Sequence, residues 1–485
     1  MINKDTFLAA RDCAYGAWHS HRADGATAPT PGESLRMWQG QEIHRLARQR
    51  YPDGVPVTCV EQSAAAAETE APLAAGGPAV VFEALITAAP LVARPDILIR
   101  DGDGWRLVEV KSSLNLKAGL IDDMAYTLMV LNRAGITVTD SSLLLLSRDY
   151  RKNAPAEHLF VSHPATEESK AAAGQLEAER AAIVATLLAA GPPPAVPCSA
   201  CRQCGLEIDE CPVRQLEHPV YELPGLREKK IAGLVGSGVH EIKDVPDDFS
   251  LSADQELVRR AVVENRPWTS PSLGAALARV QWPAYYLDFE TVSTALPLYD
   301  GVEPWTQVPT QFSVHVCDRP GHVVDHQEFL GDPLQDPRRA LACELIRVLG
   351  TGGSVIVYSG FEGRILGWLQ EGFTELSSQL AAIQGRLVDL CEIVKKAYRH
   401  PDFCGSLSIK RTLPVMVPDM SYDNLNIAEG DTASAVYALM ALGRIGADQL
   451  PQRRADLLEY CKQDTLAMVR IHQVLDGLAS GAAAV

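Results

Sequence analysis

The sequence predicts an α/β protein with two α/β domains and a helical connector between them. Strand-like and helical segments alternate in both halves of the chain, which is the pattern of α/β domains. Gly191 and the three prolines that follow it end the last helix of the first half. The 485 residues suffice for two to four domains. We expect domains at 1–218 and 282–478, with the connector at 219–281.

Composition and charge indicate a globular protein that is not broadly basic. Hydrophobic residues make up 47% and charged residues 22% of the chain, as in ordinary globular proteins. No apolar run reaches the ~20 residues that cross a membrane. The first ten residues include Lys4 and Asp5 and lack the apolar stretch of a secretory signal, so we expect a cytoplasmic protein. The net charge of −17 argues against a broadly basic, phosphate-coating surface, but an acidic metal site beside a basic groove remains compatible with nucleic acid.

The first half is predicted to alternate strands with helices. Residues 1–50 are expected to be helical, and 63–77, which are rich in alanine, glutamate and glycine, to form a surface loop. Alternating and β-branched patterns bounded by turn residues predict the strands. The expected strands are 79–87, 96–100, 105–111 and 142–147, and the expected helices are 121–134 and 167–190.

Two acids and a lysine lie on two predicted strands of the first half. Asp96 opens one strand, and Glu109 and Lys111 lie two positions apart on the next, so these two share one face. Two carboxylates can hold a hard divalent cation that acidifies a water, while a lysine steadies the attacking water or the phosphate charge. A surface salt bridge on a strand pair is the simpler alternative. The apolar residues that surround Glu109 on its strand favour the catalytic interpretation.

The motifs of the first half resemble the RecB-type branch of the PD-(D/E)xK nuclease superfamily. They are Gly40…His44, Glu83, Asp96 and Glu109-Val-Lys111. The resemblance implies a restriction-endonuclease-like core, and its catalytic residues would be Asp96, Glu109 and Lys111. The residues implied as ligands of Mg²⁺ or Mn²⁺ are His44, Glu83, Asp96 and Glu109. Thr127 stands where the family usually has a glutamine that helps to position the nucleic acid.

Four cysteines lie within fourteen residues after the first helical break. They are Cys198, Cys201, Cys204 and Cys211. In a reducing compartment this spacing favours a metal over disulfides, and two consecutive C-x-x-C steps are more typical of iron–sulfur clusters than of zinc sites. Several RecB-type families hold a 4Fe-4S cluster by one cysteine before the nuclease core and three after it. That resemblance implies Cys13, Cys201, Cys204 and Cys211 as ligands, with Cys198 as an alternate, and Zn²⁺ remains the alternative metal.

A second α/β unit is predicted from residue 284 onward, with three acids at its strands and last helix. Asp288 and Glu290 end an apolar strand and share one face, an arrangement used by two-metal phosphodiester hydrolysis. Tyr460 and Asp464 are four residues apart on a predicted helix and so share one helix face. The expected strands are 284–289, 310–316, 323–329 and 354–358, followed by helices to 478. An edge-strand acid pair and an ordinary polar helix face are the simpler alternatives.

These acids resemble the DnaQ-like, RNase H-fold 3′–5′ exonucleases, in which Asp-x-Glu opens the first strand and Tyr-x-x-x-Asp lies on a late helix. Ser359 replaces the usual asparagine of the middle motif, and Glu362 replaces its aspartate. Asp389 matches an extra acid of this branch. The implied catalytic residues are Asp288, Glu290, Glu362, Tyr460 and Asp464, and the implied Mg²⁺ or Mn²⁺ ligands are Asp288, Glu290 and Asp464.

A longer similarity joins the two halves. Segments 282–291, 296–301 and 309–315 resemble a bacterial family catalogued as a domain of unknown function, whose members couple a RecB-like part to this exonuclease-like part. The expected function is metal-dependent hydrolysis of phosphodiester bonds, with single-stranded DNA favoured because both resembled families act largely on it, and RNA possible. No Gly-x-x-x-x-Gly-Lys-[Ser/Thr] motif is present, so any helicase partner is expected to be a separate protein. The alternative is a nucleic-acid-binding or assembly protein of a repair or defence system in which one nuclease fold is inactive.

Overall fold

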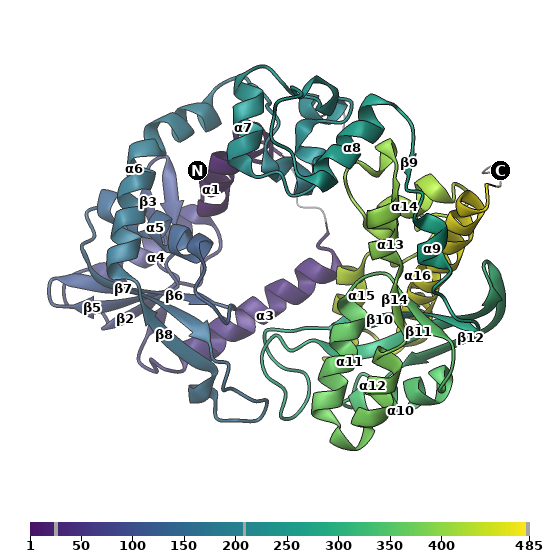
Figure 1. Cartoon of the computed structure of the whole chain (residues 1–485). Helices are drawn as coiled ribbons and strands as arrows, with labels where there is room; N and C mark the ends of the chain where they lie inside the picture. The colour runs from purple at the N-terminus through teal and green to yellow at the C-terminus, as the bar shows by residue number, and fades with distance from the viewer. Residues whose placement is uncertain (24–27, 207–209, 482–485) are drawn as a thin grey trace. The chain divides into compact units, whose positions relative to one another are not determined.

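The computed structural model in Figure 1 describes residues 1–23, 28–206 and 210–481. Its contacts divide the chain into two compact units, and each unit combines a β-sheet with helices. The first unit comprises 1–29, 33–215 and 294–306, and the second comprises 30–32, 216–293 and 307–485. The α/β prediction is therefore confirmed. No helix among the described residues is long and apolar enough to cross a membrane.

A six-stranded sheet forms the centre of the first unit. Its strands, in spatial order, are β1 (Val55–Pro56), β2 (Val80–Phe82), β5 (Ile97–Asp101), β6 (Gly104–Lys111), β7 (Val138–Leu146) and β8 (Phe160–Pro164). Strand β6 pairs antiparallel with β5 and parallel with β7, and α5 (Ala118–Arg133) is the helical crossover that a parallel pair requires. Leu107, Met124 and Leu143 pack in the core between this sheet and α5. The acid-bearing end of β6 is thereby held on a buried strand.

Helices and a short hairpin complete the first half of the chain (Figure 1). The helices are α1 (Lys4–Asp12), α2 (Ala14–Ser20), α3 (Pro31–Arg48), α4 (Gln62–Leu73) and α6 (Thr166–Leu188). Short 3₁₀ turns occur at η1 (Ala156–Leu159), η2 (Ser199–Gln203) and η4 (Pro212–Gln215), and the hairpin joins β3 (Ile86–Ala88) to β4 (Leu91–Ala93). Helix α6 packs against α5 and β7.

Two sequence predictions for this half are wrong. The expected loop at 63–77 contains helix α4, which begins where the Glu61 carboxylate accepts hydrogen bonds from the backbone N–H groups of Ser63 and Ala64. The expected strand at 79–87 is broken in two because Glu83 adopts a left-handed backbone with φ of 56°. Few residues other than glycine adopt that conformation, and it cannot continue a strand.

A five-stranded sheet forms the centre of the second unit. Its strands, in spatial order, are β12 (His322–Leu330), β11 (Val308–Arg319), β10 (Ala284–Val292), β13 (Ser354–Val357) and β14 (Leu387–Asp389). Strand β10 is central, antiparallel to β11 and parallel to β13. The long helix α16 (Leu450–Ala479) packs against β10, β11 and β12. Leu287, Phe312 and Val355 belong to the core on this sheet, and β10 and α16 together carry the predicted acids.

The remaining elements of the second unit are short. The helices are α7 (Glu228–Gly236), α8 (Ala253–Val263), α9 (Leu273–Leu277), α10 (Arg338–Leu349), α11 (Phe361–Gly372), α12 (Ser377–Gln384), α13 (Leu390–Ala397), α14 (Ile409–Met416) and α15 (Gly430–Ala441). The 3₁₀ turns are η5 (Val220–Glu222), η6 (Ile242–Asp244), η7 (Thr374–Leu376) and η8 (Pro401–Phe403). A two-stranded ribbon pairs β9 (Trp268–Thr269) with β15 (Tyr398–Arg399).

The structure places two segments differently from the predicted domain boundaries. Residues 219–281, expected as a separate connector, belong to the second unit, where β9 pairs with β15 and Asp254 forms an ion pair with Arg399. Residues 294–306 link β10 to β11 but belong to the first unit. There the backbone N–H of Ala295 donates to Oε1 of Gln39 at 2.6 Å. Gln39 and Ala295 are 256 positions apart, so local patterns do not reveal this contact.

Candidate active sites

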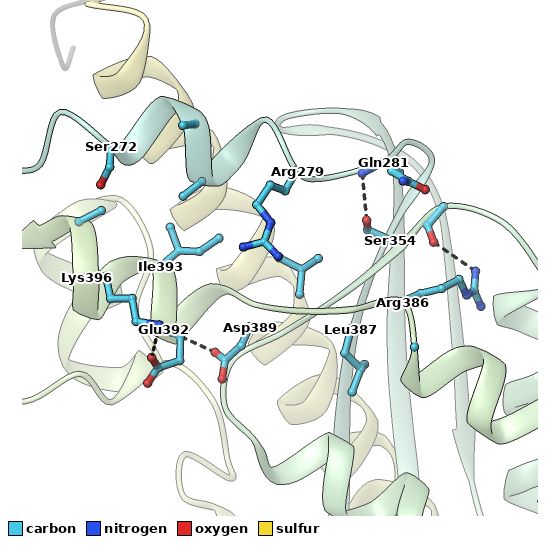
Figure 2. Close-up of a pocket in the computed structure, with 16 residues that line it drawn as sticks. Ser272, Arg279, Gln281, Ser354, Arg386, Leu387, Asp389, Glu392, Ile393 and Lys396 are labelled. Atoms are coloured by element: carbon cyan, nitrogen blue, oxygen red, sulfur yellow. Dashed lines mark hydrogen bonds and ion pairs between the residues drawn. The ribbon is translucent and has the colours of Figure 1, made fainter.

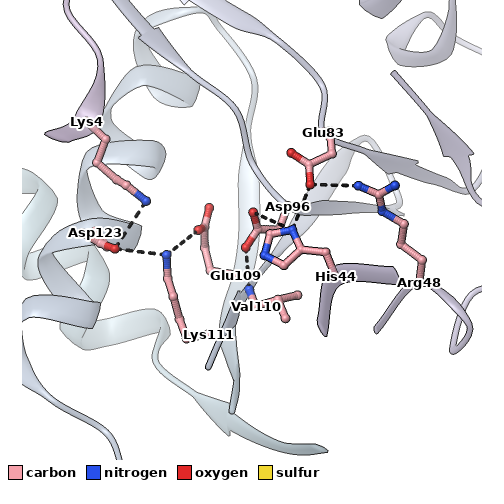
Figure 3. A network of polar contacts seen from close by, with 9 residues as sticks. All are labelled: Lys4, His44, Arg48, Glu83, Asp96, Glu109, Val110, Lys111 and Asp123. Atoms are coloured by element: carbon pink, nitrogen blue, oxygen red, sulfur yellow. Dashed lines mark hydrogen bonds and ion pairs between the residues drawn. The ribbon is translucent and has the colours of Figure 1, made fainter. Parts of the chain in front are cut away.

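The first acid site is built from three neighbouring strands and one helix. Asp96 lies immediately before β5, and its Oδ2 accepts a hydrogen bond from the backbone N–H of Val110 on β6 at 2.6 Å. That bond places Asp96 beside Glu109, which is 1% exposed. Helix α3 supplies His44, whose Nδ1 lies 3.0 Å from Oε1 of Glu83 and 3.9 Å from Oδ1 of Asp96. The ligand atoms of His44, Glu83 and Asp96 therefore lie together, and Glu109 lies on the other side of Asp96 (Figure 3).

Figure 3 shows the two flanks of this site, with His44 and Glu83 on one side of Asp96 and Glu109 with Lys111 on the other. Nζ of Lys111 lies 3.3 Å from Oε2 of Glu109. It also lies 3.1 Å from Oδ2 of Asp123, an acid on α5. The Glu109–Lys111 pair follows from the alternation of one strand, as predicted.

Three residues of this network were missed by the sequence analysis, and one of them, Lys4, has its Nζ 3.3 Å from Oδ2 of Asp123. Asp123 contacts Lys111 and also lines a cavity of about 730 Å³. Arg48, one helical turn after His44, donates to Oε1 of Glu83 at 3.0 Å. The only local signal for Arg48 was its spacing of four from His44, which places both on one helix face. Asp123 had no comparable signal, because the crossover of α5 brings it to β6.

Thr127, at the position where the resembled family has a glutamine, is buried on α5. Its side-chain hydroxyl donates to the backbone carbonyl of Asp123, four residues earlier, at 3.3 Å. A hydroxyl bonded within its own helix offers no donor to a bound strand. The side chain at this position therefore supplies no hydrogen-bond donor for nucleic acid.

The donors of the first site suit a hard divalent cation. His44, Glu83 and Asp96 each offer one ligand atom, and these atoms lie within 4.8 Å of one another. Oε1 of Glu109 is buried and has no hydrogen-bond partner among the described residues. Burial and the charge of Glu109 raise the pKa of Asp96 to about 7. Carboxylates that repel each other in a buried place gain stabilisation from a cation.

Lys111 partly offsets this negative charge. Burial alone would lower its pKa, but the carboxylates of Glu109, Asp96 and Asp123 outweigh that effect and raise the pKa of Lys111 above its ordinary value. Burial also opposes the charged form of His44, yet the hydrogen bond to Glu83 and the charge of Asp96 raise its pKa. Lys111 is therefore a fixed positive charge beside the acids.

The second acid site lies in one cavity of about 470 Å³ in the second unit. Five residues predicted from the sequence line this cavity, namely Asp288, Glu290, Glu362, Tyr460 and Asp464. Ligand atoms of Asp288, Glu290 and Asp464 lie within 4.8 Å of one another. The first two come from the central strand β10 and the third from α16, which packs on that strand. Glu362 comes from the first turn of α11.

Two further side chains, Tyr422 and Lys410, contact the residues of this site. Tyr422, which follows α14, donates its hydroxyl to Oδ1 of Asp464 at 2.5 Å. Lys410 on α14 lines the cavity, and its Nζ lies 5.2 Å from the centre of the Tyr460 ring and 5.6 Å from that of Tyr422. Lys410 also donates to the Glu429 carboxylate at 2.8 Å. The site therefore holds two tyrosines and one ammonium group beside its acids.

Burial and mutual repulsion set the charges of the second site. Burial and the charges of Asp464 and Glu290 raise the pKa of Asp288 well above its ordinary value. Burial likewise raises the pKa of Asp464 to about 6, although the hydrogen bond from Tyr422 opposes the rise. Burial raises the pKa of Glu362 to about 7, and its Oε2 has no hydrogen-bond partner among the described residues. These converging carboxylates fit one or two divalent cations.

The charge of Asp464 predicts how the metal-free protein responds to pH. Its folded-state pKa of about 6 exceeds the ordinary 3.8, so the folded protein binds this proton more tightly than the unfolded chain. Stability therefore falls as pH rises from about 4 to about 7, by roughly 2–3 kcal/mol for this group. We expect Asp464→Asn, which keeps an acceptor for Tyr422, to raise the Tm of metal-free protein at neutral pH. Adding Mn²⁺ should stabilise the wild type more than the variant.

A matched control lies on the same helix. Asp456 of α16 is buried, but its Oδ1 accepts hydrogen bonds from Asn426 and Gln452 at 2.9 and 2.8 Å. Its charge is satisfied, so Asp456→Asn should lower the Tm. If Asp464→Asn also lowers the Tm without metal at neutral pH, the carboxylates of the second site do not repel each other as described.

A separate cavity of about 670 Å³ lies beside β14 (Figure 2). Arg279 and Lys396 line it together with Asp389 and Glu392. Asp389 caps α13, since its Oδ1 accepts from the backbone N–H of Glu392 at 3.1 Å. Asp389, the extra acid suggested by the exonuclease resemblance, therefore lines this cavity and reaches Glu362 only through its charge.

Four of the cluster cysteines line one pocket of about 240 Å³ in the first unit. They are Cys13, Cys201, Cys204 and Cys211, the four that the resemblance favours. Cys13 comes from the start of α2, far along the chain from the others. Cys198 lies beside them, with its Sγ 3.5 Å from the Sγ of Cys201. Residues 207–209, between Cys204 and Cys211, lie outside the described part of the chain.

Comparison with known families gives one match. Residues 285–408 match the family described as a domain of unknown function, DUF2779. The DUF2779 region contains Asp288, Glu290 and Glu362. Tyr460 and Asp464 lie beyond its end, although they meet the first three in one cavity. The match therefore covers the sheet of the second unit and part of its acid site.

Two curated relatives also match the chain. One is the uncharacterized protein MG366 homolog of Mycoplasma pneumoniae, 28% identical over 207 residues. The other is the uncharacterized protein MG366 of Mycoplasma genitalium, 26% identical over 212 residues. Each match covers 38% of this chain and 31% of the relative, so the chain spans about a third of the length of either relative. No solved structure matches the chain.

Proposed function

We propose that the protein is a Mg²⁺- or Mn²⁺-dependent nuclease with two active sites, one in each unit. The observation that carries this proposal is the convergence of Asp288, Glu290 and Asp464 within 4.8 Å in an open cavity, from residues 176 positions apart (464 − 288). A second group of acids, around Asp96, converges independently in the other unit. Degradation of end-labelled DNA and RNA by variants of each site tests the proposal.

The second unit is proposed to be an RNase H-like exonuclease domain that removes nucleotides from a 3′ end. Bound cations would activate water and neutralise charge on the scissile phosphate. Asp288, Glu290 and Asp464 would hold them, and Tyr422 orients Asp464 through its hydrogen bond. Tyr460 lines the same cavity, where its hydroxyl can orient the attacking water. Lys410 supplies positive charge for the phosphate backbone. The central position of the acid-bearing strand β10 supports this interpretation.

The first unit is proposed to be a RecB-like PD-(D/E)xK nuclease domain. His44, Glu83, Asp96 and Glu109 would hold the cation, which lowers the pKa of a bound water. Lys111 contacts Glu109, and its ammonium group would stabilise the negative charge that the phosphate gains in the transition state. The unpartnered Oε1 of Glu109 supports this assignment.

Single-stranded DNA is the proposed substrate. The two families that the motifs resemble act largely on single strands, and the acids described above would contact phosphate through bound cations without reading a base. RNA is the competing substrate, because neither group of acids distinguishes a 2′-hydroxyl. Parallel assays on DNA and RNA of the same sequence decide between them.

A nucleic-acid-binding or assembly protein with one inactive fold is the second candidate function. The buried hydroxyl of Thr127, bonded within its own helix, is the observation that favours it for the first unit. This candidate predicts binding of single strands without cleavage by that unit.

The pocket of cysteines is proposed to hold a 4Fe-4S cluster through Cys13, Cys201, Cys204 and Cys211. A cluster here would tie α2 to the segment after α6. We expect anaerobically purified protein to be brown, with broad visible absorbance and about four irons per chain. Cys204→Ser should lose the colour, whereas Cys343→Ser, at an exposed cysteine on α10, should keep it. Colourless wild-type protein with stoichiometric zinc would contradict the iron–sulfur assignment.

A further inference from the structure

The second unit brings an imidazole, a carboxylate and a thiol together outside both acid sites. His218 lies two residues before η5 and Glu222 ends it, and Cys404 follows η8, 182 positions after Glu222 (404 − 222). One donor atom from each lies within 4.8 Å of the other two. The three residues do not belong to the set that lines the cavity of Asp288 and Asp464.

The spacing of these donors suits a small cation. Nδ1 of His218 and Oε2 of Glu222 are 3.3 Å apart, longer than the preferred 2.7–3.2 Å of an N–H···O hydrogen bond. Ligands of a tetrahedral ion with bonds of roughly 2.0–2.3 Å lie about 3.3–3.8 Å from one another. The His218–Glu222 distance therefore matches one edge of such a site.

The backbone holds the donors in place without a metal. The carbonyl of His218 accepts a hydrogen bond from the backbone N–H of Ile242 at 2.8 Å. A Cβ added at Gly405, next to Cys404, would lie 1.7 Å from the carbonyl oxygen of Glu222, so only glycine permits this approach. The two segments that carry the donors are thus packed directly against each other.

We propose that His218, Glu222 and Cys404 bind one zinc ion, with water as the fourth ligand. Imidazole and thiolate are donors that zinc prefers, whereas Mg²⁺ and Ca²⁺ prefer oxygen alone. One carboxylate and one thiolate balance the charge of Zn²⁺. Among the described residues no fourth His, Cys, Asp or Glu joins the group. The site is independent of the proposed nuclease function.

Zinc would join the segment at η5 to the loop that leads into α14. That helix carries Lys410 of the second acid site, so the ion would fix the approach to that site.

Alkylation of Cys404 in the full chain tests this proposal at the level of one residue. Purified protein, freed of loosely bound metal, is treated with iodoacetamide with and without ZnCl₂, and the modified cysteines are found by peptide mapping. Zinc should slow alkylation of Cys404 at least tenfold in the wild type. Cys343, exposed on α10, serves as the internal control and should react equally in both samples.

Two variants distinguish zinc ligation from general protection. Glu222→Gln keeps the shape of the side chain, and His218→Ala removes the imidazole, so zinc should no longer protect Cys404 in either. The buried Cys461 reports on folding, because it reacts only if the unit opens. Equal alkylation of Cys404 with and without zinc in the wild type would overturn the proposal, as would undiminished protection in the folded Glu222→Gln variant.

Discussion

Asp464→Asn is expected to slow removal of nucleotides from a 3′ end by more than about 100-fold, since even residues that only orient a metal ligand change activity 10–100-fold. The Asp464 carboxylate lies within 4.8 Å of those of Asp288 and Glu290, and the substitution removes one charge from this group. The hydrogen bond from Tyr422 is kept, because asparagine also accepts it. The measurement is the initial rate of shortening of a 5′-labelled single strand in Mn²⁺.

Asp456→Asn is the control for this loss. Asp456 lies two helical turns before Asp464 on α16 and is held by Asn426 and Gln452. Its substitution is expected to change stability but to leave the rate per folded molecule within a few-fold of the wild type. Equal rates for Asp464→Asn and the wild type would remove Asp464 from the proposed site.

Lys111→Ala is expected to reduce cleavage by the first unit about 10²–10³-fold, the usual effect of losing a group that stabilises charge in the transition state. Nζ of Lys111 lies 3.3 Å from Glu109 and 3.1 Å from Asp123. Its removal takes away one positive charge that lowers the pKa of Asp96, although His44 stays 3.9 Å from Asp96 and Lys4 stays 3.3 Å from Asp123. The pKa of Asp96 should therefore rise above about 7, and cation binding should weaken near neutral pH. Raising the pH should therefore restore part of the cation affinity, but it cannot replace the positive charge of Lys111.

The substrate for this second measurement is a single strand with a blocked 3′ end, on which the proposed exonuclease cannot act. Lys170→Ala, at an exposed lysine of α6, is the matched control and should cleave as the wild type does. If Lys111→Ala instead lost only the shortening of the strand with a free 3′ end, the assignment of Lys111 to the first site would be wrong.

Much of both sites could be predicted because their acids follow local periodicity. Glu109 and Lys111 share a face since they lie two apart on a strand, and Tyr460 and Asp464 share a helix face since they lie four apart. The structure brings each pair to the other residues of its site.

Other parts of the sites depend on tertiary packing, which leaves no local pattern. Tyr422 reaches Asp464 because the chain after α14 packs on α16, 42 positions away. Asp123 reaches Lys111 through the crossover of α5. Glu83 points toward His44 from a left-handed backbone conformation that a strand pattern cannot reveal.

The predicted connector at 219–281 also depends on tertiary packing that local sequence patterns do not reveal. This segment was expected to be helical, and short helices are present in it. Their membership of the second unit depends on the pairing of β9 with β15 and on the ion pair of Asp254 with Arg399. Both join residues well over 100 positions apart.

The central claim, two separable nuclease sites, is tested most directly by one assay on 5′-labelled single-stranded DNA with free or blocked 3′ ends. Four proteins are compared in Mn²⁺: wild type, Lys111→Ala, Asp464→Asn and the double variant. We predict that Asp464→Asn loses shortening from the free 3′ end, that Lys111→Ala loses cleavage of the blocked strand, and that the double variant loses both. Unchanged activity in both single variants, or full activity in the double variant, would contradict the two-site account.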